Sequence, residues 1–209
     1  MLLGFMMSSL PSFASQAKAD SDMQFDLRYK AWKTWVQKYG DVLSDSTGTS
    51  IGLFAEIVKL GPSALPSIME KMKEDPILVC AVIDITKKYF PPSARYNGMG
   101  WAEEAGLYLK WWYEDKDKNI RANFRQFYEK LKTPGLSSSD RKTAIESIRR
   151  LGIGVLPLLF EKIQAGDDEL SEIAKYLTNN GYPVGSDSAT LSRWWKSNLD
   201  KYVLPFPPD

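Results

Sequence analysis

The chain has 209 residues, of which 44% are hydrophobic and 25% are charged, and its formal net charge is +1. This length and composition are typical of one globular domain that folds without disulfides or metals, and the small net charge disfavours nucleic-acid binding, which normally requires a basic surplus. The sequence contains no histidine and one cysteine, which excludes histidine-dependent catalytic triads, histidine-containing zinc sites and intramolecular disulfides.

The N-terminal residues have features of an export signal. Met1–Met7 is apolar, small residues follow it, and Ala17–Ala19 fits a cleavage motif of secretory signal peptides. No basic residue precedes the apolar run, so we interpret residues 1–19 as a truncated signal peptide, with a disordered tail as the alternative. The first interpretation makes the protein secreted or periplasmic, and the second leaves it cytoplasmic. No run of about 20 apolar residues is present, so no transmembrane anchor is predicted.

Residues 20–209 are predicted to form a single α-helical domain that begins with a helix over 22–39. Leu27, Ala31 and Trp35 are spaced four residues apart, so they share one helix face, which we expect to pack against the core. We interpret this helix as a cap on the N-terminal end of the helices that follow.

An internal repeat is the main feature of the remaining sequence. The segment Leu60–Met72 recurs as Leu151–Ile163, at an offset of 91 residues, and such repeats are typical of stacked helical units. In each copy a Leu-Gly pair ends an amphipathic helix. A proline then lies near the start of the next helix, where its missing N–H would be unpaired in any case. Thr49 or Ser50 is the predicted N-cap of the first copy, and residues 137–140 supply caps in the second.

A third helix follows in each copy. Ile77–Ile83 is almost wholly apolar, which is typical of a buried helix, and a β-strand here would have no predicted partner strand. Cys80 is expected to be a buried apolar residue of this helix. The corresponding helix of the second copy is predicted to begin at Asp167.

Each copy closes with a helix that contains a tryptophan pair, Trp111–Trp112 in the first copy and Trp194–Trp195 in the second. We therefore predict two units, at about residues 50–115 and 139–203. An amphipathic helix over 118–132 lies between them and has no counterpart in this alignment of the two copies.

The Leu-Gly ending of one helix, followed by Leu-Pro near the start of the next, resembles HEAT-like repeats of the armadillo-type superfamily, with its bacterial members as the nearest match. The resemblance covers about residues 50–90 and 139–179. It implies an all-α stack of antiparallel helices with two internal units and an N-terminal capping helix. It also implies a scaffold that holds a partner on a helical face. Two units are fewer than a solenoid normally needs, so we expect a compact domain rather than an open superhelix.

The seven tryptophans are candidate core or binding residues. Trp35, Trp112 and Trp195 occupy equivalent positions that we expect to face the core. Trp111 and Trp194 lie about 100° further round their helices, so we expect them to reach the surface. An exposed tryptophan can anchor a protein interface or stack on a sugar ring.

Two segments outside the repeat are further candidates for binding. The loop over 91–100 contains Arg95 and Tyr96, and the helix over 118–132 interleaves Arg121 and Arg125 with aromatic residues. The helix can be interpreted as a patch for acidic partners, or as an ordinary amphipathic helix with a solvated polar face. Acidic neighbours dilute its charge, which favours the second interpretation.

These features predict a non-enzymatic interaction module that presents a helical face and the 91–100 loop to a protein partner. No catalytic residues, metal ligands or cofactor motifs are apparent. One alternative is a protein that acts on carbohydrate or cell-wall material, or inhibits such an enzyme, through exposed tryptophans. The other alternative is a nucleic-acid-binding HEAT-like protein, which the charge balance disfavours.

Overall fold

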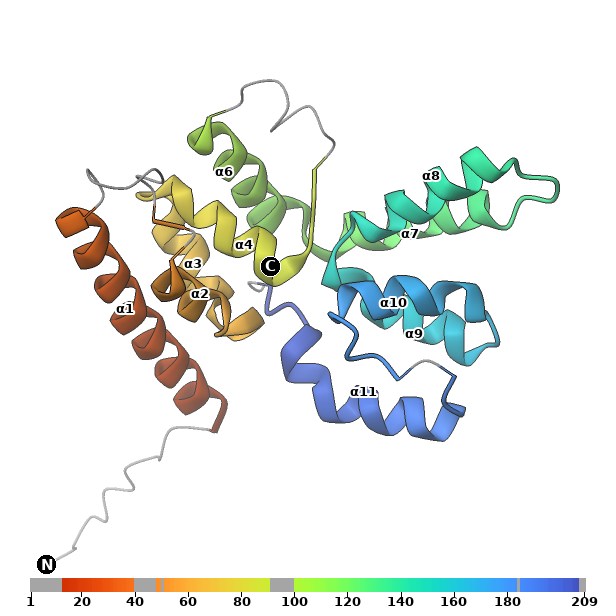
Figure 1. The fold of residues 1–209 in the computed structure, drawn as a ribbon. Coiled ribbons are helices and arrows are strands. Elements are labelled where there is room, and N and C mark those ends of the chain that lie inside the picture. Colours follow the sequence, from red (N-terminus) through yellow and green to blue (C-terminus); the bar gives the residue numbers. More distant parts are fainter. Residues whose placement is uncertain (1–12, 40–47, 50, 91–99, 184, 207–209) are drawn as a thin grey trace, which may run out of the picture.

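The computed structural model describes residues 13–39, 48–49, 51–90, 100–183 and 185–206. Every regular element within these ranges is a helix, which confirms the all-α prediction. Figure 1 shows the helices in two groups, α1 to α6 and α7 to α11, and the C-terminal end of the chain returns to the place where the groups meet.

Within the described residues, the first group consists of five α-helices and two short 3-10 turns. In chain order the helices are α1 (Phe13–Tyr39), α2 (Gly52–Val58), α3 (Leu65–Met72), α4 (Val79–Thr86) and α6 (Trp101–Lys110). The turns η2 (Gly61–Ala64) and η3 (Pro76–Leu78) lead into α3 and α4. Residues 79–86 are therefore helical, as the apolar composition predicts.

The second group repeats this order. Its helices are α7 (Lys116–Leu131), α8 (Ser138–Arg149), α9 (Leu156–Gln164), α10 (Ser171–Leu177) and α11 (Ser188–Tyr202). The turns η5 (Ile153–Val155) and η6 (Asp168–Leu170) precede α9 and α10. In Figure 1, α7 and α8 lie side by side and are joined at the outer tip of the molecule.

Side chains accept hydrogen bonds from first-turn backbone N–H groups at the starts of α8 and α11. The Ser137 hydroxyl accepts a hydrogen bond from the Asp140 backbone N–H at 3.1 Å, as predicted for the start of α8. The prediction for α2 is wrong, because its N-cap position is Ile51 rather than Thr49 or Ser50. α2 begins without a side-chain cap, so packing of its apolar face must stabilise this end.

α1 begins earlier than the sequence predicts. It starts at Phe13 rather than near residue 22, so the proposed cleavage motif at 17–19 lies inside the helix. The apolar run Met1–Met7 is outside the described residues. None of the helices that the structure describes is both long enough and apolar enough to cross a bilayer.

The predicted core face of α1 is wrong. Leu27 is 58% exposed and Ala31 also faces solvent, whereas Phe25 and Trp32 are buried. α1 carries two apolar stripes with helical spacing, and the stripe with the larger aromatic side chains is the one that packs inward. Aromatic rings remove more apolar surface from water than leucine or alanine does, so this orientation is favoured.

The two groups are joined through a π-helical turn. η4 (Trp111–Asp115) carries the chain from α6 directly into α7. Both Trp111 and Trp112 are buried at this turn. Phe206, in the returning C-terminal segment, has its ring centroid 5.5 Å from Trp111 and 5.1 Å from Trp112. The far end of the chain thus covers the tryptophan pair.

The helix over 118–132 has a counterpart in the structure, and it is α1. α1 packs on α2 and η2, and α7 packs on the equivalent elements α8 and η5. Phe25 and Tyr29 of α1 match Phe124 and Tyr128 of α7 in spacing and in ring contact, with centroids 5.7 and 5.5 Å apart. The prediction that the helix over 118–132 has no counterpart is therefore wrong.

The same tyrosine–lysine–aspartate contact, which we call the polar lock, attaches each of these helices to its own unit. The Tyr29 hydroxyl donates to Asp75 at 2.8 Å, and Lys33 pairs with Asp75 at 3.0 Å. In the second unit, the hydroxyl of Tyr128 and the ammonium of Lys132 approach Asp167 at 2.8 and 2.7 Å. Among the described elements, the repeated unit thus contains five α-helices, and it begins at α1 and at α7 rather than at residues 50 and 139.

Candidate functional site

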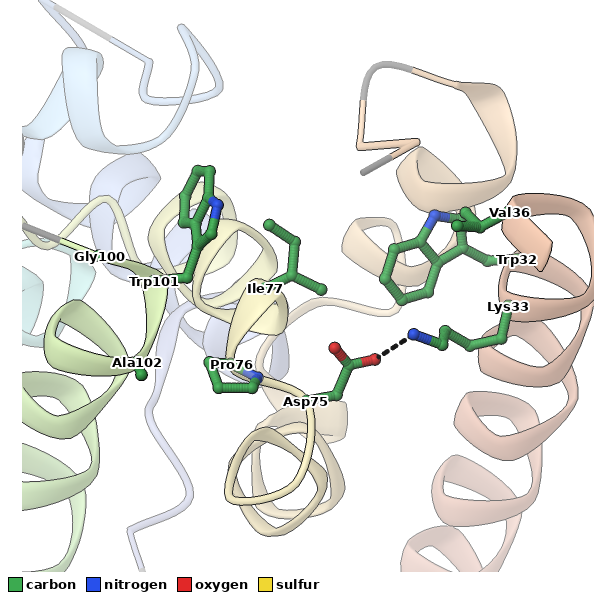
Figure 2. Close-up of a pocket in the computed structure, with 9 residues that line it drawn as sticks. All are labelled: Trp32, Lys33, Val36, Asp75, Pro76, Ile77, Gly100, Trp101 and Ala102. Atoms are coloured by element: carbon green, nitrogen blue, oxygen red, sulfur yellow. Dashed lines mark ion pairs between the residues drawn. The ribbon is translucent and has the colours of Figure 1, made fainter. Parts of the chain in front are cut away.

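A hollow of about 510 Å³ opens between the C-terminal half of α1, the turn η3 and the start of α6. Figure 2 shows its lining, with Trp32 and Trp101 on opposite sides and Ile77 between them. We call it the α1–α6 pocket. Its lining residues are Trp32, Lys33, Val36, Asp75, Pro76, Ile77, Gly100, Trp101 and Ala102.

Trp32 forms the fixed wall of the α1–α6 pocket. It is 1% exposed, its indole N–H donates to the Gly48 carbonyl at 3.1 Å, and its ring meets Phe54 edge to face with centroids 5.1 Å apart. A buried indole with its N–H satisfied and its ring packed has one stable orientation. This side of the pocket is therefore preorganised.

Trp101 forms the opposite, accessible side. It is the first residue of α6 and is 43% exposed, the largest exposed fraction of any tryptophan among the described residues. The Gly100 backbone N–H donates to the Glu103 carboxylate at 3.3 Å, which holds the start of α6 in place. Because a first-turn residue has no preceding helical turn to cover it, the ring stays open to solvent.

The charged groups at the floor of the pocket neutralise one another. Figure 2 shows the ion pair between Lys33 and Asp75. Asp75 also accepts from the Tyr29 hydroxyl, and burial together with this carboxylate raises the pKa of Tyr29 far above its usual value. Asp75 is the one carboxylate in the described lining and already has two partners. The arrangement suits binding of an apolar group better than proton transfer.

The corresponding place in the second unit has a different chemistry. The segment after Asp167 places Glu169 where the first unit has Ile77. Glu169 pairs with Lys132 at 3.2 Å and also with Arg141. An ion network therefore stands where the first unit has an apolar surface. The shared scaffold therefore does not require an apolar surface at this place, where the described residues of the second unit carry charges.

The structure does not bring the sequence-predicted site residues together. Trp111 is 2% exposed, so the prediction that it reaches the surface is wrong, and its indole N–H has no acceptor among the described residues. Trp194 is half-buried and stacked on Tyr202, with ring centroids 5.8 Å apart. Arg121 and Arg125 are exposed on α7, away from the pocket. Arg95 and Tyr96 lie outside the described residues.

The burial of Trp111 has a tertiary cause. Lys88 and Phe206, from two distant parts of the chain, cover its ring together with Tyr108, a neighbour on the same helical segment. Helix periodicity does not reveal contacts of this kind. Trp101, in contrast, has a local sequence signal, because it directly follows Gly100 and the turn-forming residues that precede α6. We expect first-turn aromatic residues to be less covered than those of later turns.

Within the ranges that the structure describes, no group of three or more acidic or cysteine side chains is arranged to hold a metal ion. Comparisons with protein-family models, with curated proteins and with solved structures gave no match to this chain. Functional inference therefore depends on the geometry of the α1–α6 pocket and on its difference from the second unit.

Proposed function

We propose that this protein is a non-enzymatic interaction module and that the α1–α6 pocket binds an apolar or aromatic side chain of a protein partner. The observation that carries this proposal is the apolar pocket of the first unit, at a place where the second unit has the Lys132–Glu169–Arg141 network. A rigid Trp32 and an exposed Trp101 face the same space. Exposed tryptophans beside a pocket are favoured anchors of protein interfaces.

The pocket also indicates the chemistry of the partner. Its volume of about 510 Å³ accommodates one or two large side chains. The Lys33–Asp75 pair leaves no net charge on the floor. A partner segment fits these features if it carries an aromatic or branched apolar side chain as the anchor and has no charged side chain beside it. An anchor of either charge would have to enter an apolar surface without a free counter-ion.

A carbohydrate-acting protein remains the second candidate, because Trp101 could stack on a sugar ring. The remaining described tryptophans are buried or half-buried, so they do not form a row of exposed platforms. Asp75 is engaged by Lys33 and Tyr29 and has no second carboxylate beside it in the lining. Hydrolysis of glycosides normally uses two opposed carboxylates. These facts favour the protein-binding function.

The proposal is tested by selecting binders without assuming a partner. The full chain is panned against a random peptide library and against an array of oligosaccharides, and selected ligands are titrated by calorimetry. We expect peptides with a shared apolar or aromatic anchor. Trp101→Ala should weaken their binding about tenfold or more, because an aromatic anchor contact is lost.

Two further variants make this result specific to the pocket. Ile77→Glu places the residue type of the second unit in the pocket, and it should abolish binding. Leu199→Ala alters an exposed side chain on α11 (37% exposed) and should leave the affinity unchanged. Selection of oligosaccharides alone, or peptide affinities that do not change in Trp101→Ala and Ile77→Glu, would contradict the proposal.

A further inference from the structure

α1 has a second apolar stripe that faces solvent. Met23 is 53% exposed and Leu27 is 58% exposed, and Ala31 continues the four-residue spacing on the same face. Phe25 and Trp32 are buried on the opposite face of the helix. We call Met23, Leu27 and Ala31 the outer stripe. It is separate from the α1–α6 pocket, and its role does not depend on the proposed function of that pocket.

The second unit supplies an internal comparison for this stripe. When Phe25 and Tyr29 are aligned with their counterparts in α7, the three positions of the outer stripe fall on Ala122, Gln126 and Lys130. These three residues are exposed as well. The scaffold therefore tolerates polar residues at the second and third positions. In repeat proteins the terminal unit normally has a polar outer face, so the apolar stripe on α1 departs from what folding requires.

The charges beside the outer stripe are divided between the two halves of α1. Asp20 and Asp26 are exposed in the first half, and Lys30 and Lys38 are exposed in the second. Two such helices placed antiparallel would bring the acidic half of each against the basic half of the other. With Leu27 beside the two-fold axis, Asp26 of one copy lies near Lys30 of the other copy, and the contact occurs twice. This pattern is self-complementary.

We propose that two copies of this chain associate through antiparallel packing of their α1 helices along the outer stripe. Each copy presents the same patch to the other, which is the usual geometry of a closed dimer. A specific interface normally buries about 1,000 Å² or more, and one pair of helices supplies a small contact by that standard. The dimer therefore depends on protein concentration. The α1–α6 pocket faces a different side of α1 and stays open.

Analytical ultracentrifugation of the full chain over a wide concentration range tests this proposal. We expect a monomer–dimer equilibrium. Leu27→Glu should raise the dissociation constant about tenfold or more, because two like charges would replace the central apolar contact beside the axis. The matched control is Gln126→Glu, which makes the same residue at the equivalent exposed position of α7 and should leave the equilibrium unchanged.

Charge exchange tests the antiparallel register. Asp26→Lys or Lys30→Asp alone should weaken the dimer at low ionic strength, and the double variant should restore it, because both pairs are then formed with reversed signs. A chain that stays monomeric at the highest attainable concentration would overturn the proposal. The outer stripe would then be covered by the first residues of the same chain or by another protein. A dimer that is indifferent to Leu27→Glu, or that the double variant does not restore, would overturn the proposal as well. Circular dichroism confirms that each variant is folded.

Discussion

Lys88 shows how one residue at the junction of the units responds to burial. It is 8% exposed, and its ammonium lies 4.7 Å from the centroid of Phe90 and 5.2 Å from that of Trp111. Burial lowers the pKa of Lys88 to about 8, although the negative charge of Asp115 acts in the opposite direction. The two aromatic faces offset part of the unfavourable burial of charge.

Replacing Lys88 by methionine should therefore stabilise the protein at pH 7. In the wild type the folded state releases the Lys88 proton near pH 8, while the unfolded state holds it to about 10.5. The free energy of unfolding should rise with pH across this window, by about 3 kcal/mol from this group. In Lys88→Met that rise should be absent.

Urea denaturation from pH 7 to 10.5 measures this difference. Lys59→Met, at an exposed position, serves as the control and should follow the wild-type curve. A Lys88→Met variant that is less stable than the wild type at pH 7 would show that contacts of the charged ammonium outweigh its burial.

At the scale of single elements, α1 and α7 show that one motif attaches a helix to each unit. A phenylalanine, a tyrosine and a lysine at four-residue spacing lie on one helix face, and an aspartate after the Leu-Pro helix accepts from the tyrosine and the lysine. A further lysine from each Leu-Pro helix lies over the tyrosine ring, at 5.5 Å in the first unit and 5.4 Å in the second. Repetition of the whole constellation indicates a structural role.

The aspartate of the second lock should make stability sensitive to acid. Burial by itself raises the pKa of Asp167, but hydrogen bonds from Lys132 and Tyr128 outweigh it and hold the pKa below the usual value. This contribution to stability is present above the usual aspartate pKa of about 3.9 and is lost as the pH falls through the lower folded value.

We therefore expect Asp167→Asn to be less stable than the wild type at pH 6 and to lose less stability below pH 4. Urea midpoints measured from pH 6 to pH 2 test this expectation. Asp84→Asn, at an exposed position of α4, should keep the wild-type slope. Equal slopes for Asp167→Asn and the wild type would contradict the role assigned to the lock.

At the scale of the whole molecule, the two units meet through close backbone contacts. The Tyr89 backbone N–H donates to the Arg150 carbonyl at 3.1 Å, which links the two units. Gly152 has φ of +75°, and a Cβ placed there would lie 2.5 Å from the Thr86 carbonyl oxygen and 2.7 Å from the Lys88 nitrogen. Its equivalent in the first unit, Gly61, has φ of +68° but open space around it.

Substitution of these two glycines distinguishes the effect of backbone strain on stability from the effect of close contact between the units. Gly61→Ala should reduce the free energy of unfolding by about 1 kcal/mol, because only the left-handed conformation is penalised. Gly152→Ala should reduce it by about 3 kcal/mol or more, because the backbone of the first unit must also move. Thermal denaturation compares the two variants, and equal losses would mean that the units do not approach each other as closely as described.

Local patterns in the sequence determined the helices, because the apolar spacing, the Leu-Gly endings and the Leu-Pro starts act over a few neighbouring residues. They also place Ser137 at an N-cap and make residues 79–86 helical. The correspondence of α1 with α7 can be predicted from the Phe-Tyr-Lys spacing that both helices share. An alignment on the Leu-Pro segments does not show it, because the two helices are separated by a different number of residues.

Tertiary structure alone decided which apolar face of α1 packs inward. The face with Leu27 and the face with Trp32 both show helical spacing, and they differ only in how much apolar area each can bury. Tertiary structure also decided that Trp111 is covered, since Phe206 reaches it from the other end of the chain. The α1–α6 pocket combines residues from three elements, and no periodic pattern connects them. Helix formation depends on neighbours in sequence, whereas a binding surface depends on which sequence-distant segments meet.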